Sequence, residues 1–417
     1  MPSATGPWPL PSFCRPALKV ENSKTQTGLK EKGLAVYVHW PFCLAKCPYC
    51  DFNSHVRENF ADLNQTVWAD ALIADLKHDA VRLEENAGPA TSLFFGGGTP
   101  SLMMADTVAR VIDAVDQYTG FADDAEITLE ANPTSVEASR FSDYISAGVS
   151  RFSLGVQALR DDDLKALGRQ HSVAEALAAV EVARKLCDNV SFDLIYARPG
   201  QSLEQWRTEL DEALAFEPSH LSLYQLTIER GTAFFERWRQ GNLVLPEEDL
   251  ATDMFDLTNE ACASQDLVAY EVSNYARPGR ESRHNISYWQ SDPYMGIGPG
   301  AHGRLDGGEG RIATTRLRSP EKWLAAVSGE GHGIDNEEII EGDTLIAEVL
   351  MMGLRLNTGL SEARFQALTG KTFARALPTE ALQDLINGEF VSLSDHVLAV
   401  TPKGRNVLNA VTEKLLV

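Results

Sequence analysis

Short apolar runs alternate along the chain with longer amphipathic segments. The short runs are rich in β-branched and aromatic residues, which favour strands, and they occupy residues 34–40, 91–95, 126–131, 151–156, 190–196, 220–226 and 268–275. Between them, apolar residues recur at a spacing of three or four, which indicates helices with one buried face. These helices are expected at residues 63–83, 103–118, 172–186, 203–216 and 247–262. Strand followed by helix, six or seven times, predicts a parallel sheet in an α/β fold.

Periodicity alone does not choose between a doubly wound sheet and a partial or complete barrel, because both repeat the same strand-helix unit. In either arrangement the ligand site lies at the carboxyl ends of the strands. Residues that directly follow the predicted strands are therefore the first candidates for function.

The rest of the chain follows other patterns. Residues 278–306 are dense in glycine, proline and aromatic residues, which is typical of a linker or cover segment. Helices are expected at 345–356, 361–368 and 380–387, and a hairpin at 390–401. We therefore expect four parts: a disordered leader (1–33), an α/β barrel (34–275), a linker segment (276–343) and a small C-terminal domain of helices and a hairpin (344–417).

Length and charge limit the function further. The chain has 417 residues, 44% of them hydrophobic, and a formal net charge of -22. This size and apolar content predict a globular protein of two or three domains. Such a negative charge repels a phosphate backbone, so nucleic acid is not expected as a partner. No apolar stretch approaches the roughly 20 residues that span a bilayer, and the proline-rich leader lacks the apolar core of a signal peptide.

Three of the six cysteines lie within eight residues, at Cys43, Cys47 and Cys50. Six cysteines are too few for a disulfide scaffold in a chain of this length, and clustering in a reducing cytoplasm indicates metal binding. The other three, Cys14, Cys187 and Cys262, are expected to be structural. A cytoplasmic location follows as a prediction.

The cysteine spacing also indicates which metal is bound. Structural zinc needs four ligands, and His39 and His55 do not continue the usual zinc spacing. A four-iron cluster normally takes four cysteines, so three leave one iron with an open coordination position. The loop therefore predicts an iron-sulfur cluster that can bind a further ligand.

The C-x3-C-x2-C loop, with Tyr49 before its last cysteine, resembles the signature of radical S-adenosylmethionine (SAM) proteins. The resemblance implies a [4Fe-4S] cluster whose open iron is chelated by the amino and carboxylate groups of SAM. A glycine-rich turn after the second strand, without the Gly-Lys-Ser/Thr of a P-loop, lets the backbone approach a ligand closely, although it also suits a simple turn. The SAM pocket suggested in this way comprises Tyr37, Tyr49, Gly97, Gly98, Thr99, Glu130, Gln157, Arg169 and Asp193.

Further segments resemble one family within this group. The stretches YVHWPFC, FFGGGTPS, ITLEANP, FSLGVQ, LGRQHS and FDLIYARPGQ resemble the oxygen-independent coproporphyrinogen III oxidase family, over roughly residues 34–417. The family implies a partial TIM barrel with a small, winged-helix-like C-terminal domain. It includes decarboxylating oxidases and HemW-type haem chaperones. The oxidases have a further cysteine where this chain has Phe52 and carry a longer leader, so the chaperone branch is favoured.

A third motif supports that branch. His284, Asn285, Tyr288 and Trp289 match the HNxxYW pattern of HemW-type proteins. An imidazole can bind haem iron, and aromatic rings offer flat apolar faces to a porphyrin. The alternative is a buried core histidine with aromatic packing. His302 is a second, weaker ligand candidate, in a Gly-x-Gly-x-x-Gly stretch whose context does not fit a dinucleotide site.

The sequence thus predicts a haem chaperone that holds a [4Fe-4S] cluster, SAM and haem, and has no assigned catalytic residue. Its implied partners are haem-acceptor proteins, such as respiratory membrane enzymes. Reaching membrane enzymes requires transient association with a membrane surface. Such a surface repels an acidic chain electrostatically. The alternatives are an oxygen-independent coproporphyrinogen III oxidase and an iron-sulfur regulator. Homodimer formation is left open.

Overall fold

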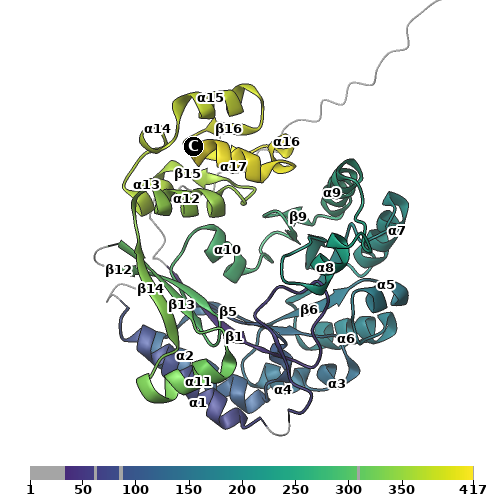
Figure 1. Cartoon of the computed structure of the whole chain (residues 1–417), viewed down its shortest axis with the longest axis vertical. Helices are drawn as coiled ribbons and strands as arrows, with labels where there is room; N and C mark the ends of the chain where they lie inside the picture. The colour runs from purple at the N-terminus through teal and green to yellow at the C-terminus, as the bar shows by residue number, and fades with distance from the viewer. Residues whose placement is uncertain (1–32, 61–62, 84–87, 308–309, 417) are drawn as a thin grey trace, which may run out of the picture. The chain divides into compact units, whose positions relative to one another are not determined.

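The computed structural model describes residues 33–60, 63–83, 88–307 and 310–416 (Figure 1). The described residues belong to one compact unit. The predicted leader lies, apart from its last residue, outside the described residues. No helix in the described part of the chain is long and apolar enough to cross a bilayer.

The centre of the unit is a sheet of twelve strands. Six adjacent strands are parallel, and they are β1 (Leu34–Trp40), β4 (Ala90–Gly97), β5 (Phe121–Ala131), β6 (Arg151–Gln157), β7 (Val190–Tyr196) and β8 (His220–Gln225). Each contains one of the first six predicted apolar runs or most of it. The prediction of an α/β fold of about six strand-helix units is confirmed.

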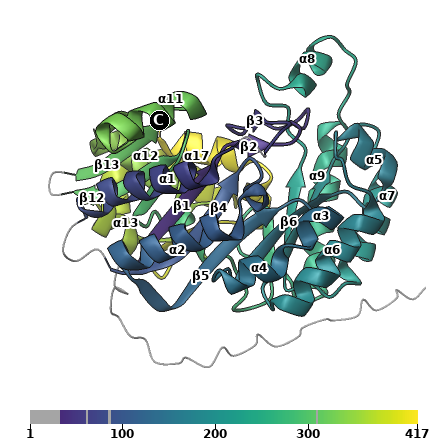
Figure 2. The ribbon, with the colours of Figure 1, turned by 90° about the horizontal axis from the view of Figure 1, so that it is seen from below.

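Amphipathic helices cover the outer face of these strands (Figure 2). The larger ones are α1 (Gln65–Ala80), α2 (Ala105–Thr119), α6 (Val173–Leu186), α7 (Leu203–Leu214) and α9 (Glu248–Ala263). Ser172 and Ser202 begin α6 and α7 with capping boxes, in which each serine and the third helical residue satisfy each other's backbone N–H. Trp206 and Phe95, both fully buried, belong to the core between helices and sheet.

The predicted seventh strand, residues 268–275, is wrong as a single parallel strand. It is a pair of short antiparallel strands, β9 (Val268–Ala269) and β10 (Asn274–Ala276), at the edge of the sheet. A bend at residues 270–273 ends the first strand and reverses the chain, which periodicity alone did not detect.

Residues 294–340, expected as linker, extend the other edge of the sheet. They form β11 (Tyr294–Ile297), parallel to β1, and then antiparallel β12 (His302–Gly307), β13 (Gly310–Arg316) and β14 (Ile334–Ile340). Glycine residues make these strands hard to predict from the sequence, but they allow the strands to pack closely. A Cβ on Gly296 would lie 1.7 Å from the carbonyl oxygen of His302. The four-part domain division itself stays a prediction.

The C-terminal part has its own apolar core, which includes Val349, Phe365, Leu398 and Val411. Its elements are α12 (Gly342–Gly353), β15 (Leu360–Ser361), α13 (Glu362–Thr369), α14 (Phe373–Ala376), α15 (Thr379–Asn387), β16 (Val391–Ser394), β17 (Val397–Val400), α16 (Pro402–Arg405) and α17 (Leu408–Leu416). Strands β15 to β17 form a small antiparallel sheet. The predicted helices and hairpin are confirmed.

Candidate functional site

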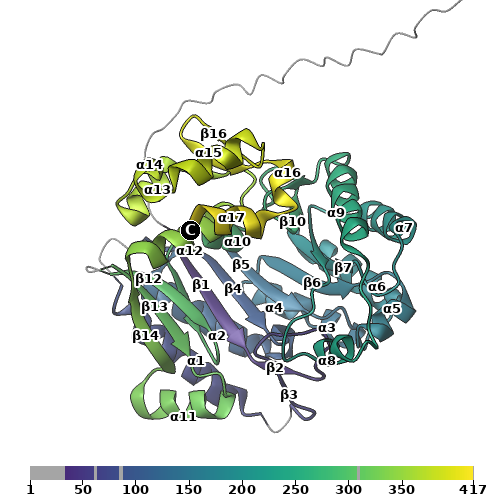
Figure 3. The same cartoon turned by 45° about the horizontal axis from the view of Figure 1, so that its top comes forward.

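The three clustered cysteines lie on the loop that follows β1, at the carboxyl end of the parallel strands (Figure 3). Two short parallel strands, β2 (Phe42–Cys43) and β3 (His55–Val56), hold the two ends of this loop together. Cys43 is buried, Cys47 and Cys50 are half-buried, and all three are free thiols. The position is the one expected for a ligand site in a parallel α/β fold.

Each of the three sulfur atoms has a polar neighbour. Thr99 Oγ1 donates to Cys43 Sγ at 3.4 Å, and Arg169 Nη1 donates to Cys47 Sγ at 3.5 Å. Cys50 Sγ lies 3.8 Å from Ser54 Oγ. Hydrogen-bond donors around thiolates are typical of iron-sulfur sites, where they tune the cluster. Three thiols with these neighbours fit the donor set of a four-iron cluster with one open iron.

A single-ion site does not fit this loop. Within the described ranges, no three His, Cys, Asp or Glu side chains come together to hold one metal ion. His39 Nε2 is bonded to the backbone oxygen of Asn53 at 2.9 Å, and His55 Nε2 to Asn53 Oδ1 at 3.3 Å. Both histidines are thus engaged by Asn53.

Burial raises the pKa of the Cys43 thiol to about 11. A cysteine must be deprotonated to bind a metal. In the metal-free protein this thiol therefore holds its proton at neutral pH, and a bound iron would replace that proton.

A hydrogen-bonded path joins two of the cysteines through Asn132, a residue that the sequence did not single out. Asn132 Nδ2 donates to Thr99 Oγ1 at 3.2 Å, and Arg169 Nη2 donates to Asn132 Oδ1 at 2.6 Å. With the contacts to sulfur, the path runs from Cys43 through Thr99, Asn132 and Arg169 to Cys47. Three loops that follow different strands are thereby fixed around the cysteine loop.

The glycine-rich turn packs directly against the segment before the cysteines. Gly97 has a φ of 110°, and a Cβ there would lie 2.6 Å from the ring of His39. A Cβ on Gly98 would lie 2.6 Å from the backbone oxygen of Phe42. The glycines thus bring Thr99 within reach of Cys43, which a longer side chain would prevent. Their contact with SAM stays a prediction.

Two predicted carboxylates face the inside of the barrel. Glu130 Oε2 accepts a bond from the Gly97 N–H at 3.2 Å. Burial, and then the charge of Asp193, raise the pKa of Glu130 to about 8. Burial raises the pKa of Asp193 to about 7, and Ser222 and Arg169 oppose that rise. Asp193 Oδ1 is buried and has no partner among the described residues, so a ligand hydroxyl or ammonium would satisfy it.

The remaining predicted SAM residues lie around the same interior. Gln157 ends β6 with a positive φ of 73°, and its Nε2, like Arg169 Nη2, lies close to Gly155. The Tyr37 hydroxyl lies 3.1 Å from His39 Nδ1, and burial raises its pKa. The Tyr49 ring lies 6.2 Å from that of Phe234. Tyr37 and Asp193 lie in the middle of their strands, and the Tyr37 ring stacks on that of His284 at 6.1 Å, so the predicted set extends from the cysteine loop into the barrel interior.

The HNxxYW motif lies at the opposite end, on helix α10 (Arg283–Trp289) (Figure 3). His284 is only 2% exposed. Its Nδ1 lies 3.1 Å from Ser92 Oγ at the start of β4, and its ring stacks on Phe94 at 4.8 Å. Burial lowers the pKa of His284 to about 3, so its ring is neutral. Its Nε2 is buried without a partner among the described residues.

The other motif residues point to different neighbours. Asn285 Nδ2 donates to the Tyr270 hydroxyl at 3.1 Å. The Tyr288 ring packs edge-on against Tyr294 at 4.5 Å, and Arg355 lies over the Trp289 ring at 5.3 Å. His302, on β12, is exposed. Tyr288 also packs edge-on against His284 at 4.6 Å. The assignment of the four motif residues to haem stays a prediction.

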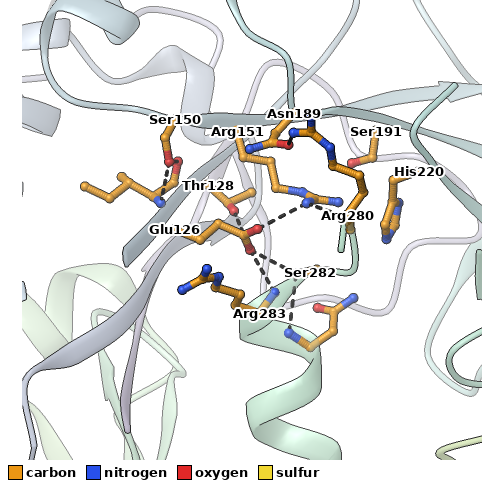
Figure 4. A network of polar contacts seen from close by, with 12 residues as sticks. Glu126, Thr128, Ser150, Arg151, Asn189, Ser191, His220, Arg280, Ser282 and Arg283 are labelled. Carbon is orange, nitrogen blue, oxygen red and sulfur yellow. Dashed lines mark hydrogen bonds and ion pairs between the residues drawn. The ribbon is translucent and has the colours of Figure 1, made fainter. Parts of the chain in front are cut away.

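A buried polar network fixes the start of α10 (Figure 4). Glu126 accepts bonds from Arg151 Nη1 at 3.1 Å, from Ser282 Oγ at 3.3 Å and from the Arg283 N–H at 3.1 Å. Arg151 Nη1 also donates to the backbone oxygen of Arg280 at 3.2 Å. The network closes the amino end of the barrel beneath the motif, and no feature of the sequence pattern predicted it.

Comparison with known proteins identifies two family patterns in the chain. Residues 37–213 match the radical SAM superfamily, and residues 340–407 match the HemN C-terminal domain. The first match contains the cysteine loop and the residues around the barrel interior up to Asp193. The second covers most of the separate C-terminal core.

Curated relatives match over almost the whole chain. A zebrafish (Danio rerio) protein, "Radical S-adenosyl methionine domain-containing protein 1, mitochondrial", is 38% identical over 92% of this chain and 86% of its own length. The "Heme chaperone HemW" of Escherichia coli is 36% identical over 92% of this chain and 98% of its own length.

A solved structure shares the fold. Coproporphyrinogen III oxidase (HemN) from Escherichia coli, described as a radical SAM enzyme, superposes with a TM-score of 0.76 over 92% of this chain and 90% of its own. Its sequence identity is 21%. The likeness confirms the partial radical SAM barrel with its small C-terminal domain.

Proposed function

Since this chain belongs to the HemW family of the radical SAM superfamily, we propose that it is a haem chaperone. It binds haem and passes it to acceptor proteins. The observation that supports this most is the match to HemW over nearly the full length of both chains. The superfamily implies a [4Fe-4S] cluster and SAM.

The residues present fit the cluster and SAM. The thiols of Cys43, Cys47 and Cys50 would hold three irons, and the bound cluster would supply an open iron that the amino and carboxylate groups of SAM could chelate. We propose that Arg169, whose Nε is buried without a partner among the described residues, would pair with the methionyl carboxylate. Asp193 Oδ1, buried without a described partner, would accept a hydrogen bond from SAM.

Decarboxylation of coproporphyrinogen III is the second candidate, because the HemN fold is shared. One residue argues against it. Phe52 stands where the oxidase motif has a further cysteine, and its side chain is 59% exposed beside the cysteine loop. We therefore propose that the chain keeps the radical SAM framework and not the oxidase activity.

Transfer of haem distinguishes a chaperone from a mere haem binder. The protein, with cluster, SAM and haem, is mixed anaerobically with a haem-depleted b-type cytochrome, or with apomyoglobin as a passive trap. A chaperone delivers haem to the cytochrome faster than it loses haem to the trap. Equal rates would mean passive release and contradict the proposal. Cytoplasmic location, respiratory acceptors and visits to a membrane surface stay predictions.

We also propose His284 as the axial haem ligand, through its free Nε2 atom. Because this atom is buried, α10 must move before iron can reach it. His284→Ala should then weaken haem binding and leave the cluster absorbance unchanged, whereas His302→Ala, at the exposed second candidate, should change neither if His284 is the ligand. Unchanged haem affinity in His284→Ala would refute the assignment.

A further inference from the structure

A cavity of about 790 Å³ opens beside the cysteine loop. It lies between helix α8 (Ala233–Arg239), the loop that follows β8, and Arg318, and we name it the α8 cavity. Its volume is within the roughly 300–1,000 Å³ of sites that hold small molecules and cofactors. Its lining includes Ile228, Arg230, Phe235, Trp238, Leu245 and Arg318.

Two arginines of this cavity have no ion-pair partner among the described residues. They are Arg230 and Arg318, and both are exposed. Asp51 and Glu229 also line the cavity but do not engage them. Guanidinium groups bind carboxylates with paired hydrogen bonds. In a chain of net charge -22, such unpaired cations provide a local attraction for an anionic ligand.

The same cavity offers apolar and aromatic surface. Trp238 is 50% exposed, and Phe235 lies 5.9 Å from it, ring to ring. Ile228 and Leu245 add aliphatic surface. A ligand that suits this lining has a flat apolar face for the tryptophan and carboxylates at one edge for the arginines. A haem with its two propionates has this shape, and Asp51 and Glu229 disfavour orientations that place a propionate on their side.

Helix α8 is attached to the cysteine loop. The Phe234 N–H donates to the backbone oxygen of Pro48 at 2.8 Å, and the Phe234 ring contacts Tyr49. A ligand in the α8 cavity would therefore rest next to the loop that carries the thiols. His284, in contrast, is enclosed at the other end of the barrel.

We propose that the α8 cavity is the first docking site for haem, with the propionates on Arg230 and Arg318 and the ring against Trp238. The inference rests on the proposed haem-chaperone function and adds to it the place where haem first binds. It does not depend on which residue later binds the iron.

The test measures haem association by stopped-flow absorbance, with cluster-loaded protein. Arg230→Ala/Arg318→Ala should lower the association rate about tenfold, since two exposed charge-assisted contacts are lost. The control Arg207→Ala/Arg375→Ala removes the same charge from exposed arginines elsewhere and should stay near wild type. Equal rates in the two double variants would overturn the proposal.

Two further measurements identify the ligand group and the aromatic face. Haem dimethyl ester, which lacks free carboxylates, should associate with wild type and with the cavity variant at the same rate. A difference between them would contradict propionate recognition. Trp238→Ala should also slow haem association severalfold, and a wild-type rate would exclude the ring contact.

The outcomes separate this inference from the function. A wild-type protein that takes up no haem would refute the chaperone proposal and this inference with it. Normal haem uptake by the cavity variant would refute the docking site alone. Retained cluster absorbance and thermal unfolding midpoint show that the variants are folded.

Discussion

Two carboxylates of the barrel interior have pKa values raised well above their ordinary range. Glu130 and Asp193 come from β5 and β7, face the same space, and have pKa values raised by burial to about 8 and about 7. The sequence predicted both residues as lying at or near strand ends; Glu130 is the penultimate residue of β5, whereas Asp193 lies in the middle of β7. It could not predict their protonation, which depends on burial that only the assembled barrel provides.

The raised pKa of Glu130 predicts how stability depends on pH. Its ordinary pKa is 4.5, so between that value and about 8 the folded state holds a proton that the unfolded state has released. Stability from this group is present at low pH and is lost as pH rises. In the SAM-free protein, we expect the unfolding free energy to fall by about 1–2 kcal/mol between about pH 5.5 and 7.5 on account of Glu130.

Glu130→Gln removes the titrating group and keeps its shape. Urea unfolding at the two pH values should show a smaller decrease for this variant than for wild type. Asp193 remains in this variant, and its pKa is also raised. Some decrease of stability with rising pH should therefore persist. An identical decrease in both proteins would show that Glu130 titrates normally.

At the same scale, spacing predicted the metal ligands but not their supporting residues. Three cysteines in eight residues are conspicuous in any sequence. Asn132 is not, because an asparagine before a proline is typical of any turn. Its role depends on three loops meeting, which is a property of the fold.

Removal of Asn132 tests that role. Asn132→Ala breaks the path between Thr99 and Arg169 without touching a cysteine. We expect the cluster to form but to be lost to a chelator about tenfold faster, as is typical when a supporting residue of a metal site is removed. The decay of cluster absorbance measures this, with the exposed loop variant Asn242→Ala as control. Equal decay in the two variants would mean that the path does not support the cluster.

At the scale of elements, the six parallel strands were predictable because they are buried on both faces and read as apolar runs. Strands β12 to β14 were not. Strand β14 has the sequence IDNEEII, exposed at all positions except its two ends, and β12 begins and ends with polar residues and glycine. They join the sheet through backbone pairing and a buried ion cluster. Neither interaction produces a regular spacing of apolar residues in the sequence.

That ion cluster joins α1 to the added strands. Arg316, on β13, contacts Asp75 at 3.2 Å and Asp79 at 2.6 Å, and all three side chains are fully buried. Asp75 also accepts bonds from the N–H groups of Gly298 and Gly333. Arg316→Ala leaves two buried carboxylates without their cation.

We expect Arg316→Ala to destabilise the protein by about 3–5 kcal/mol, the usual cost of breaking a buried ion pair from one side. Arg82→Ala, which breaks a partly exposed pair with Glu337, should cost less than about 1 kcal/mol. Urea unfolding compares the two variants. If both cost the same, the cluster does not hold the added strands to α1.

At the scale of the whole molecule, the two ends of the barrel differ. The carboxyl end carries the cysteine loop and the α8 cavity, whereas the amino end is closed by α10 and its network (Figures 3 and 4). Tyr37, one of the candidate SAM residues, lies between the two ends and stacks on His284 at 6.1 Å. The C-terminal part contacts α10 through Arg364, which donates to the Gln290 backbone oxygen and pairs with Asp292. Sequence motifs predicted which residues matter but not this separation, because a motif carries no information on distance from another motif.

The comparisons and one residue bear on the choice between chaperone and oxidase. Family membership supports haem binding, while the shared HemN fold shows only that the framework is the same. Phe52, where the oxidases have a further cysteine, most directly marks the difference between the two functions. Its effect can be measured only when haem binding and coproporphyrinogen III turnover are compared.

The most direct measurement is a paired anaerobic assay on cluster-loaded protein: haem titration by absorbance, beside turnover of coproporphyrinogen III with SAM and a reductant. We expect tight, stoichiometric haem binding and no release of carbon dioxide. Sustained carbon dioxide release, with weak or absent haem binding, would show instead that this chain is an oxidase whose three cysteines suffice.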